Sequence, residues 1–168
     1  MKLHPFRALH PTPQSATRVA SPPYDVIDTT EAKALAAGNA DSFLHVIRPE
    51  IDLPPGTSLY AEAVYAMARA NLDGLIARGV LVEDSEPAVW LYRLTMGQHQ
   101  QTGFFGVSEV ADYAAGRIKK HEFTRPDKED DRTRHVDTLQ AHAGPVFLTC
   151  PDVDERGALF HPAPLEGR

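Results

Sequence analysis

The stretch AVWLYRLTMGQHQQTGFFGVSE, residues 88–109, decides the fold class of this chain. Two runs rich in aromatic and aliphatic residues, 88–95 and 102–109, flank the turn sequence MGQHQQ, and this pattern predicts an antiparallel β-hairpin. Elsewhere in the chain, helical patterns separate the strands that we expect. A hairpin combined with helix-separated strands favours an α+β fold, with a mixed sheet and flanking helices, over a regular doubly wound sheet.

Length and composition indicate one globular domain. The chain has 168 residues, of which 42% are hydrophobic and 24% are charged, and a chain of this size supports a single core. We therefore predict one α+β domain over residues 1–150, with an extended proline-rich N-terminal arm over residues 1–27 that lies across the domain. Residues 151–168 are predicted to form a tail. The single cysteine, Cys150, lies in the apolar run PVFLTC and is expected to be buried and unreactive.

The net charge and the hydropathy of the chain argue against nucleic acid and membranes as partners. The net charge of −6 argues against broad binding to nucleic acid or to anionic membranes. No apolar run approaches the roughly 20 residues that cross a bilayer, and the N-terminus lacks the continuous apolar stretch of a secretory signal. We therefore expect a cytoplasmic protein without broad nucleic-acid or membrane partners. The sequence leaves the oligomeric state open.

Local signals predict two helices in the first half of the chain. Residues 28–31, DTTE, have the spacing of a capping box, and the helix that follows is expected to run through Ala37. A stripe of apolar residues at helical spacing predicts a second helix over residues 59–78, closed by Gly79.

Other apolar runs predict strands. Buried strands are expected at residues 43–47 and 145–150, and a short strand at residues 117–122. The charged run after this short strand is expected to form a helix with Thr124 as its N-cap, ended by Gly-Pro at residues 144–145.

The segment IKKHEFTRPDKEDDRTRH, residues 118–135, holds the candidate site. On a helix that begins near Arg125, the residues Lys128, Arg132 and His135 recur at intervals of four and three, so they share one face. A face with these cationic and titratable groups could hold a phosphate. A structural alternative is open, because the same helix carries three favourably spaced intrahelical pairs, Glu129–Arg132, Asp130–Arg134 and Asp131–His135.

The dipeptide His121-Glu122 falls between the predicted short strand and the predicted helix, where backbone N–H groups and side chains converge on ligands. A carboxylate there, beside several cations, would stay ionised and could accept a proton from a substrate hydroxyl.

A metal site is the competing hypothesis for this segment, since it contains five possible ligands, His121, Glu122, Asp127, Asp131 and His135. The sequence HEFTR lacks the second histidine of the zinc motif His-Glu-x-x-His. We therefore expect no dedicated metal site, although magnesium that arrives with ATP or ADP would need only one or two carboxylates. The phosphate-binding GxxxxGK[ST] loop, the GxGxxG turn and the GxSxG elbow are all missing from the sequence.

Several blocks of sequence resemble an uncharacterised family, domain-of-unknown-function family 1015. The resemblance rests on five blocks: PFRAL at residues 5–9, PPYDV at 22–26, SFLHVIRPEIDLP at 42–54, KKHEFTRPDKEDDRTRH at 119–135 and GPVFL at 144–148. It covers nearly the whole chain. The proline-rich blocks have a structural interpretation as rigid loops, and within the third block His45 and Arg48 are candidate substrate-binding residues because they adjoin a loop after a predicted strand.

A more distant resemblance is to the ParB-like fold of free-serine kinases. It rests on IKKHE, a helix and the apolar PVFL, and it implies that a ParB-like element lies near the C-terminus. It also implies that Glu122 is the base for a substrate hydroxyl, with His121 beside it. The cationic helix would then bind phosphate through Arg125, Lys128, Arg132 and His135. The Asp-Gly-His-His-Arg segment of those relatives is missing after Cys150, so the chain resembles the N-terminal part of a longer protein with only half of the catalytic machinery.

The function expected from these features is phosphoryl transfer to a small hydroxylated metabolite such as serine. The alternative from another class is a non-catalytic module of ParB-like type that binds a nucleotide or a protein. Turnover separates the two, because a binding module holds its ligand without forming a phosphorylated product.

Overall fold

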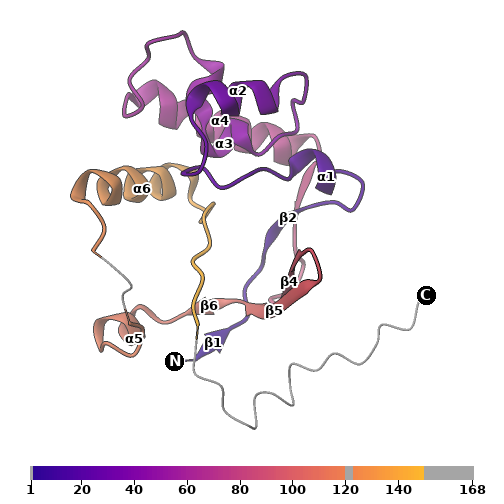
Figure 1. Ribbon diagram of the computed structural model, residues 1–168, viewed down its shortest axis with the longest axis vertical. Coiled ribbons are helices and arrows are strands. Elements are labelled where there is room, and N and C mark those ends of the chain that lie inside the picture. The colour runs from indigo at the N-terminus through magenta and orange to yellow at the C-terminus, as the bar shows by residue number, and fades with distance from the viewer. Residues whose placement is uncertain (1, 120–122, 150–168) are drawn as a thin grey trace. The chain divides into compact units, whose positions relative to one another are not determined.

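The computed structural model describes residues 2–119 and 123–149 (Figure 1). Where the sequence predicted one domain, the chain divides into two compact units. Among the described residues, the first unit holds 2–8, 85–119 and 146–149, and the second holds 9–84 and 123–145. Helices and antiparallel strands occur in both units, so the α+β prediction is confirmed.

The second unit is mainly helical. Its elements are β2 (Leu9–Pro11), α1 (Ala16–Val19), α2 (Thr29–Ala36), α3 (Leu44–Ile47), the 3₁₀ helix η1 (Pro49–Asp52), α4 (Glu62–Ala77), β3 (Leu81–Glu83) and α6 (Pro126–Leu139). Strand β2 pairs antiparallel with β3. Helix α4 contacts α3, η1, β3 and α6, and is therefore the central element of this unit.

Two clusters of buried apolar side chains form the core of the second unit. One joins α1, α3, α4, β3 and α6 through Val19, Val46, Ala68, Leu72, Leu75, Val80, Leu81 and Leu139. The other joins α2, α3 and η1 through Ala32, Ala36, Leu44, Ile47 and Ile51. Removal of these side chains from water is the main stabilising contribution to the unit.

Helices α2 and α4 form as the sequence predicts. The Asp28 carboxylate accepts a hydrogen bond from Glu31 N at 2.8 Å, and Asp28 N donates to the Glu31 carboxylate at 3.0 Å, which completes the capping box. Helix α4 falls within the predicted range, and most of its apolar stripe is buried. The chain leaves it at Gly79, as expected.

The strand predicted at residues 43–47 is wrong, because this segment contains α3. Its residues are buried as expected, with Leu44 1% and Val46 0% exposed. A short apolar run is compatible with either a buried strand or a buried helix, so its periodicity alone does not distinguish the two.

The strand predicted at residues 145–150 is also wrong over 145–149, where the chain forms no regular element and Phe147 is 69% exposed. Cys150 lies outside the described residues. Residues 117–119 form no strand, and the remainder of that predicted strand lies outside the described residues.

The boundaries of α6 differ from the prediction at both ends. Arg125, not Thr124, is the N-cap, and Pro126 takes the first helical position, where its missing N–H costs nothing. The helix ends at Leu139 because Gln140 adopts a left-handed conformation with φ 51°.

The predicted N-terminal arm contains regular structure. Helix α1 and strand β2 both lie within residues 1–27, and Val19 of α1 is a member of the core. The arm therefore contributes to the centre of the second unit instead of only lying across it.

The first unit contains the predicted hairpin. Its elements are β1 (Leu3–His4), β4 (Trp90–Met96), β5 (His99–Phe105), β6 (Val107–Ser108) and α5 (Val110–Ala114). Strands β4 and β5 pair antiparallel, and Gly97, with φ 60°, takes the first position of their two-residue turn, where a type II′ turn favours glycine. Strand β1 pairs with β6, and a Cβ atom on Gly106 would lie 2.8 Å from Leu3 Cγ, so any other residue there would force the Leu3 side chain to shift.

The strands within residues 2–119 and 123–149 do not form the mixed sheet that was predicted. Those in the described part of the chain make three separate antiparallel pairs, β1 with β6, β2 with β3 and β4 with β5. No helix within residues 2–119 and 123–149 is long and apolar enough to cross a membrane.

Candidate functional site

Helix α6 is anchored in the core of the second unit by its C-terminal half. His135 is 3% exposed and Leu139 is 2% exposed. The Nε2 atom of His135 donates a hydrogen bond to the carbonyl oxygen of Val46 at 3.1 Å. Burial lowers the pKa of His135, since desolvation disfavours the imidazolium. The prediction that His135 lies on an exposed phosphate-binding face is therefore corrected. Its side chain is buried and holds α6 against Val46.

Two cations of the predicted phosphate face lie beside tyrosine rings. The guanidinium carbon of Arg132 is 4.3 Å from the centroid of the Tyr24 ring, a cation–π geometry. The same side chain pairs with Asp131 at 2.7 Å. Lys128 Nζ lies 3.4 Å from Tyr60 Oη and 5.9 Å from the centroid of that ring. The N-terminal half of α6 thus presents two cations, each beside one tyrosine ring.

The third predicted cation, Arg125, sits at the N-cap of α6. It pairs with Asp127 at 2.8 Å, and the two side chains are 75% and 45% exposed. An ion pair this exposed is worth at most about 1 kcal/mol. Arg125 is therefore free to exchange this partner for a ligand at little cost.

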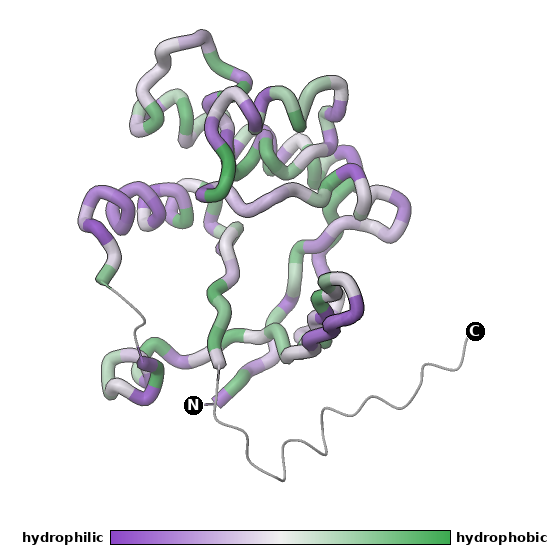
Figure 2. Tube along the Cα trace, in the orientation of Figure 1, coloured by the Kyte–Doolittle hydropathy of each residue, from purple (hydrophilic) through white to green (hydrophobic). Residues whose placement is uncertain are grey.

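None of the three intrahelical pairs predicted for α6 forms among the described residues, and two of their members, Arg134 and Asp131, contact α4. Arg134 forms an ion pair with Glu62 at the start of α4 and stacks on the Tyr65 ring, with its guanidinium carbon 4.3 Å from the centroid. Asp131 accepts a hydrogen bond from Tyr65 Oη at 2.7 Å. The charges of this helix therefore attach it to its neighbour. Figure 2 shows α6 as a largely hydrophilic helix, in keeping with this role for polar contacts.

A cavity of about 260 Å³ lies between α4 and α6, lined by Tyr60, Tyr65, Asp127, Asp130, Asp131 and Arg134. Burial, and then the hydrogen bond to Asp131, raise the pKa of Tyr65 to about 12. Tyr65 is therefore a neutral hydrogen-bond donor near neutral pH. Asp130 makes no hydrogen bond or ion pair within the described ranges, so its carboxylate is available to a ligand.

Arg48 joins two of the sequence blocks that carry the family resemblance. Its Nη1 atom donates to the carbonyl oxygens of Tyr24 at 2.9 Å and Ile27 at 3.0 Å, both in or next to the PPYDV block. Its Nε atom pairs with Glu50 at 2.8 Å, and its Nη2 atom donates to Thr29 Oγ1 at 3.0 Å. All of its terminal nitrogens are used inside the protein. We therefore correct the assignment of Arg48 from substrate binding to structural support of the Tyr24 loop.

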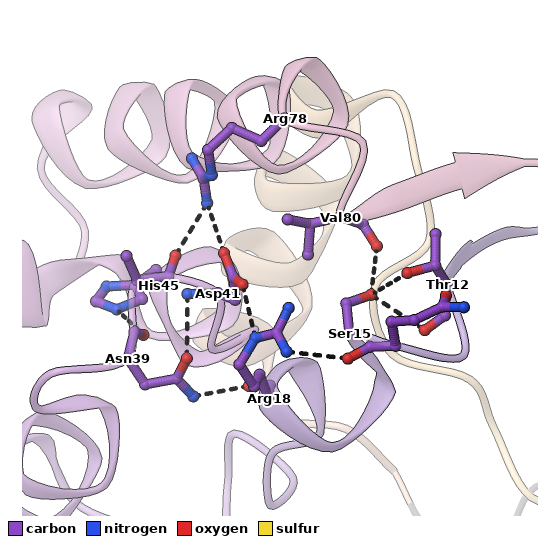
Figure 3. A network of polar contacts seen from close by, with 10 residues as sticks. Thr12, Ser15, Arg18, Asn39, Asp41, His45, Arg78 and Val80 are labelled. Atoms are coloured by element: carbon purple, nitrogen blue, oxygen red, sulfur yellow. Dashed lines mark hydrogen bonds and ion pairs between the residues drawn. The ribbon is translucent and has the colours of Figure 1, made fainter.

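His45 lines a second cavity of about 300 Å³ in the same unit, with Asp52, Asn71 and Arg78 among its polar neighbours. Its Nδ1 atom is 2.9 Å from the Asp52 carboxylate, and its Nε2 atom is 3.1 Å from the carbonyl oxygen of Asn39. Figure 3 shows the His45 ring turned toward Asn39, with Asp41 and Arg78 nearby. The cavity that His45 lines is distinct from the one beside α6, and its role as a binding residue stays a prediction.

The predicted catalytic pair, His121 and Glu122, lies outside the described residues. Within the described part of the chain, no group of three or more histidine, cysteine, aspartate or glutamate side chains could hold a metal ion. A magnesium ion held chiefly by nucleotide phosphates needs fewer protein ligands than such a group supplies.

The family of the chain follows from comparison with known proteins. The model of the family described as "Protein of unknown function (DUF1015)" matches residues 3–165. The chain therefore belongs to this family, as the sequence blocks indicated. No curated protein and no solved structure matches it.

Sequence reasoning missed the tyrosines of the site. Tyr24 lies in the quoted PPYDV block, but its ring could be paired with Arg132 only after the chain had folded. Tyr60 and Tyr65 lie near the start of the predicted helix over residues 59–78, and the sequence reasoning gave them no role in the site. No local pattern pointed to their contacts with α6.

Proposed function

We propose that this chain is a phosphoryl-transfer protein, a kinase whose acceptor is the hydroxyl group of a small metabolite such as serine. One observation carries the proposal: Lys128 and Arg132 lie beside the Tyr60 and Tyr24 rings on a helix whose other half is fixed in the core. Fixed cations are the main protein contribution to phosphoryl transfer, because the reaction depends on positioning and on neutralisation of phosphate charge.

The cations have distinct roles in this proposal. Lys128 supplies a compact ammonium group whose one described side-chain hydrogen bond, to Tyr60, is long. Arg132 uses Nε and Nη2 for Asp131, which leaves Nη1 for a phosphate oxygen. Arg125 adds a third, exposed cation at the helix start. Charge-assisted hydrogen bonds of this kind are about twice as strong as neutral ones.

Magnesium would enter with the nucleotide. Asp127 and Asp130 line the cavity beside Tyr60, and two carboxylates match the protein contribution that a nucleotide-bound magnesium ion requires. The ion would neutralise phosphate charge when bound. The two aspartates are close enough in sequence, three residues apart on α6, to face the same ligand.

Glu122 is the proposed base, on the resemblance of IKKHE to the free-serine kinases. Its carboxylate would take the proton of the acceptor hydroxyl as that oxygen forms a bond to the transferred phosphorus. The bond from phosphorus to the bridging oxygen of the nucleotide would break, and the nucleotide would leave with one phosphate fewer.

Turnover with labelled nucleotide tests this proposal. The protein is incubated with magnesium and ATP or ADP labelled on the terminal phosphate, with serine and other small hydroxylated acceptors, and the labelled product is separated. We expect any product that the native chain forms to be lost in the Glu122→Gln variant, whose folding is checked by circular dichroism. Equal product from both proteins would refute the role of Glu122.

A second candidate function is a non-catalytic module that binds a nucleotide or a protein. The existing ion pairs of Arg125 and Arg132 favour it. Arg125 and Arg132 each pair with an aspartate, so a phosphate must replace or share an existing ion pair. Retention of labelled nucleotide without product would support this candidate. If neutralisation of Lys128 and Arg132 changed neither binding nor activity, the helix would be purely structural.

A further inference from the structure

The cavity lined by His45 has unused hydrogen-bond donors at one end and an unused hydrogen-bond acceptor at the other. It is bounded by α4 and by the 39–41 loop, and lies entirely in the second unit. Its polar groups are His45, Asp52, Asn71 and Arg78, and Met67 and Ala70 supply part of its apolar lining.

Arg78 provides the unused donors. Its Nη2 atom donates to Ala40 O at 3.1 Å and to the Asp41 carboxylate at 3.2 Å (Figure 3). Its Nη1 and Nε atoms make no hydrogen bond within the part of the chain that the structure describes. Asp41 is shared with Arg18, which pairs with it at 3.0 Å, so two guanidinium groups face one carboxylate. The surplus charge at this end of the cavity is positive.

Asn71 provides the unused acceptor. Its Nδ2 atom donates to the carbonyl oxygen of His45 at 2.7 Å and to the Asp52 carboxylate at 2.9 Å. Both partners are acceptors, so the amide orientation is fixed and its Oδ1 atom is the remaining group. Among the described residues, Oδ1 has no hydrogen-bond partner. The Asp52 carboxylate beside it adds negative charge to this end.

The two ends are separated by about one helical turn. A Cβ atom on Gly74 would lie 3.2 Å from Arg78 Nη1, so the guanidinium lies over Gly74. Gly74 follows Asn71 by three residues, which is a rise of about 4.5 Å at 1.5 Å per residue. A ligand that joins both ends must therefore carry its anionic and cationic groups close together.

We propose that this cavity binds an α-amino acid with an apolar side chain. The ligand carboxylate accepts hydrogen bonds from Arg78 Nη1 and Nε. Its ammonium group donates to Asn71 Oδ1 and to the Asp52 carboxylate, and its side chain packs on Met67 and Ala70. A zwitterion with one carbon between its charged groups matches the short separation of the two ends. The site does not depend on the proposed phosphoryl transfer.

Nuclear magnetic resonance titrations test the ligand class. L-Leucine is added to the isotopically labelled chain, and backbone amide shifts are followed. Two partial ligands, 4-methylpentanoate without the ammonium group and isopentylamine without the carboxylate, are titrated in parallel. We expect saturable shifts at residues 40, 71, 74 and 78 with L-leucine, and at least about tenfold weaker binding of each partial ligand, because each loses a charged hydrogen-bonding group.

Two variants and one control test the residues. Arg78→Gln removes the charged donor, and Ala70→Phe fills the cavity from an exposed helix position without a change in charge. Arg93→Gln removes the same charge from a residue of the first unit that does not line this cavity. We expect about tenfold or greater weakening in the first two variants and native binding in the control. Absence of saturable shifts with L-leucine, or equal affinity in all three variants, would overturn the proposal.

Discussion

Replacement of Arg48 by alanine should cost the second unit several kcal/mol of stability. The Arg48 and Glu50 side chains are only 14% and 7% exposed, and their charged atoms are 2.8 Å apart. Loss of one member of a buried ion pair typically costs about 3–5 kcal/mol, because the other charge stays buried without its partner. The variant also leaves the carbonyl oxygens of Tyr24 and Ile27 without this donor. We therefore expect a loss of about 3–5 kcal/mol in the free energy of unfolding, toward the upper end of that range.

Urea denaturation followed by far-ultraviolet circular dichroism measures this loss, since all described helices except α5 lie in the second unit. The double variant Arg48→Met with Glu50→Gln removes both charges and should be more stable than Arg48→Ala. Asp73→Asn is the control, because the Arg69–Asp73 side chains are 42% and 51% exposed and their pair is worth about 0.5 kcal/mol. A loss below about 1 kcal/mol for Arg48→Ala would refute the argument from burial, since it would match an exposed pair.

Two further predictions concern local interactions. The pKa of His135 is lower in the folded protein than in the unfolded chain, where it is about 6.5, so its contribution to stability is present above that pH and is lost as the pH falls. The free energy of unfolding, measured from pH 8 to pH 5, should therefore fall on acidification, and should fall less in the His135→Gln variant. Identical slopes for the two proteins would contradict the prediction. Asp28→Ala should lower the unfolding free energy by about 0.5–2 kcal/mol through loss of the α2 cap, with Asp28→Asn closer to the native value, and equal losses would contradict a capping role.

Features that depend on neighbouring residues were predictable from the sequence. The capping box at Asp28 and the β4–β5 hairpin each depend on contacts within a short stretch, so residue types and spacing suffice. Helix α3 was not predictable, because its identity as a helix depends on the elements that bury it. The N-terminal limit of α6 was missed by one residue, since the preference of Pro126 for the first turn outweighed the capping tendency of Thr124.

The candidate site was predictable only in part. The cationic stripe of α6 was visible as a periodic pattern, but the pattern continues into the core, where His135 and Leu139 pack. Periodicity identifies a face and does not say which part of that face meets solvent. The contact of Arg132 with Tyr24 joins residues more than a hundred positions apart, and such contacts follow from the tertiary fold.

The central claim is that the N-terminal half of α6 binds nucleotide phosphates through Lys128 and Arg132. Calorimetric titration of magnesium-ADP into the native chain and into the Lys128→Ala, Arg132→Ala double variant tests it most directly. The matched control, Lys33→Ala with Arg93→Ala, removes the same charge from residues outside α6. The account predicts saturable binding by the native chain and the control, and at least about tenfold weaker binding by the α6 variant. Equal affinity in all three proteins, or no binding by the native chain, would contradict it.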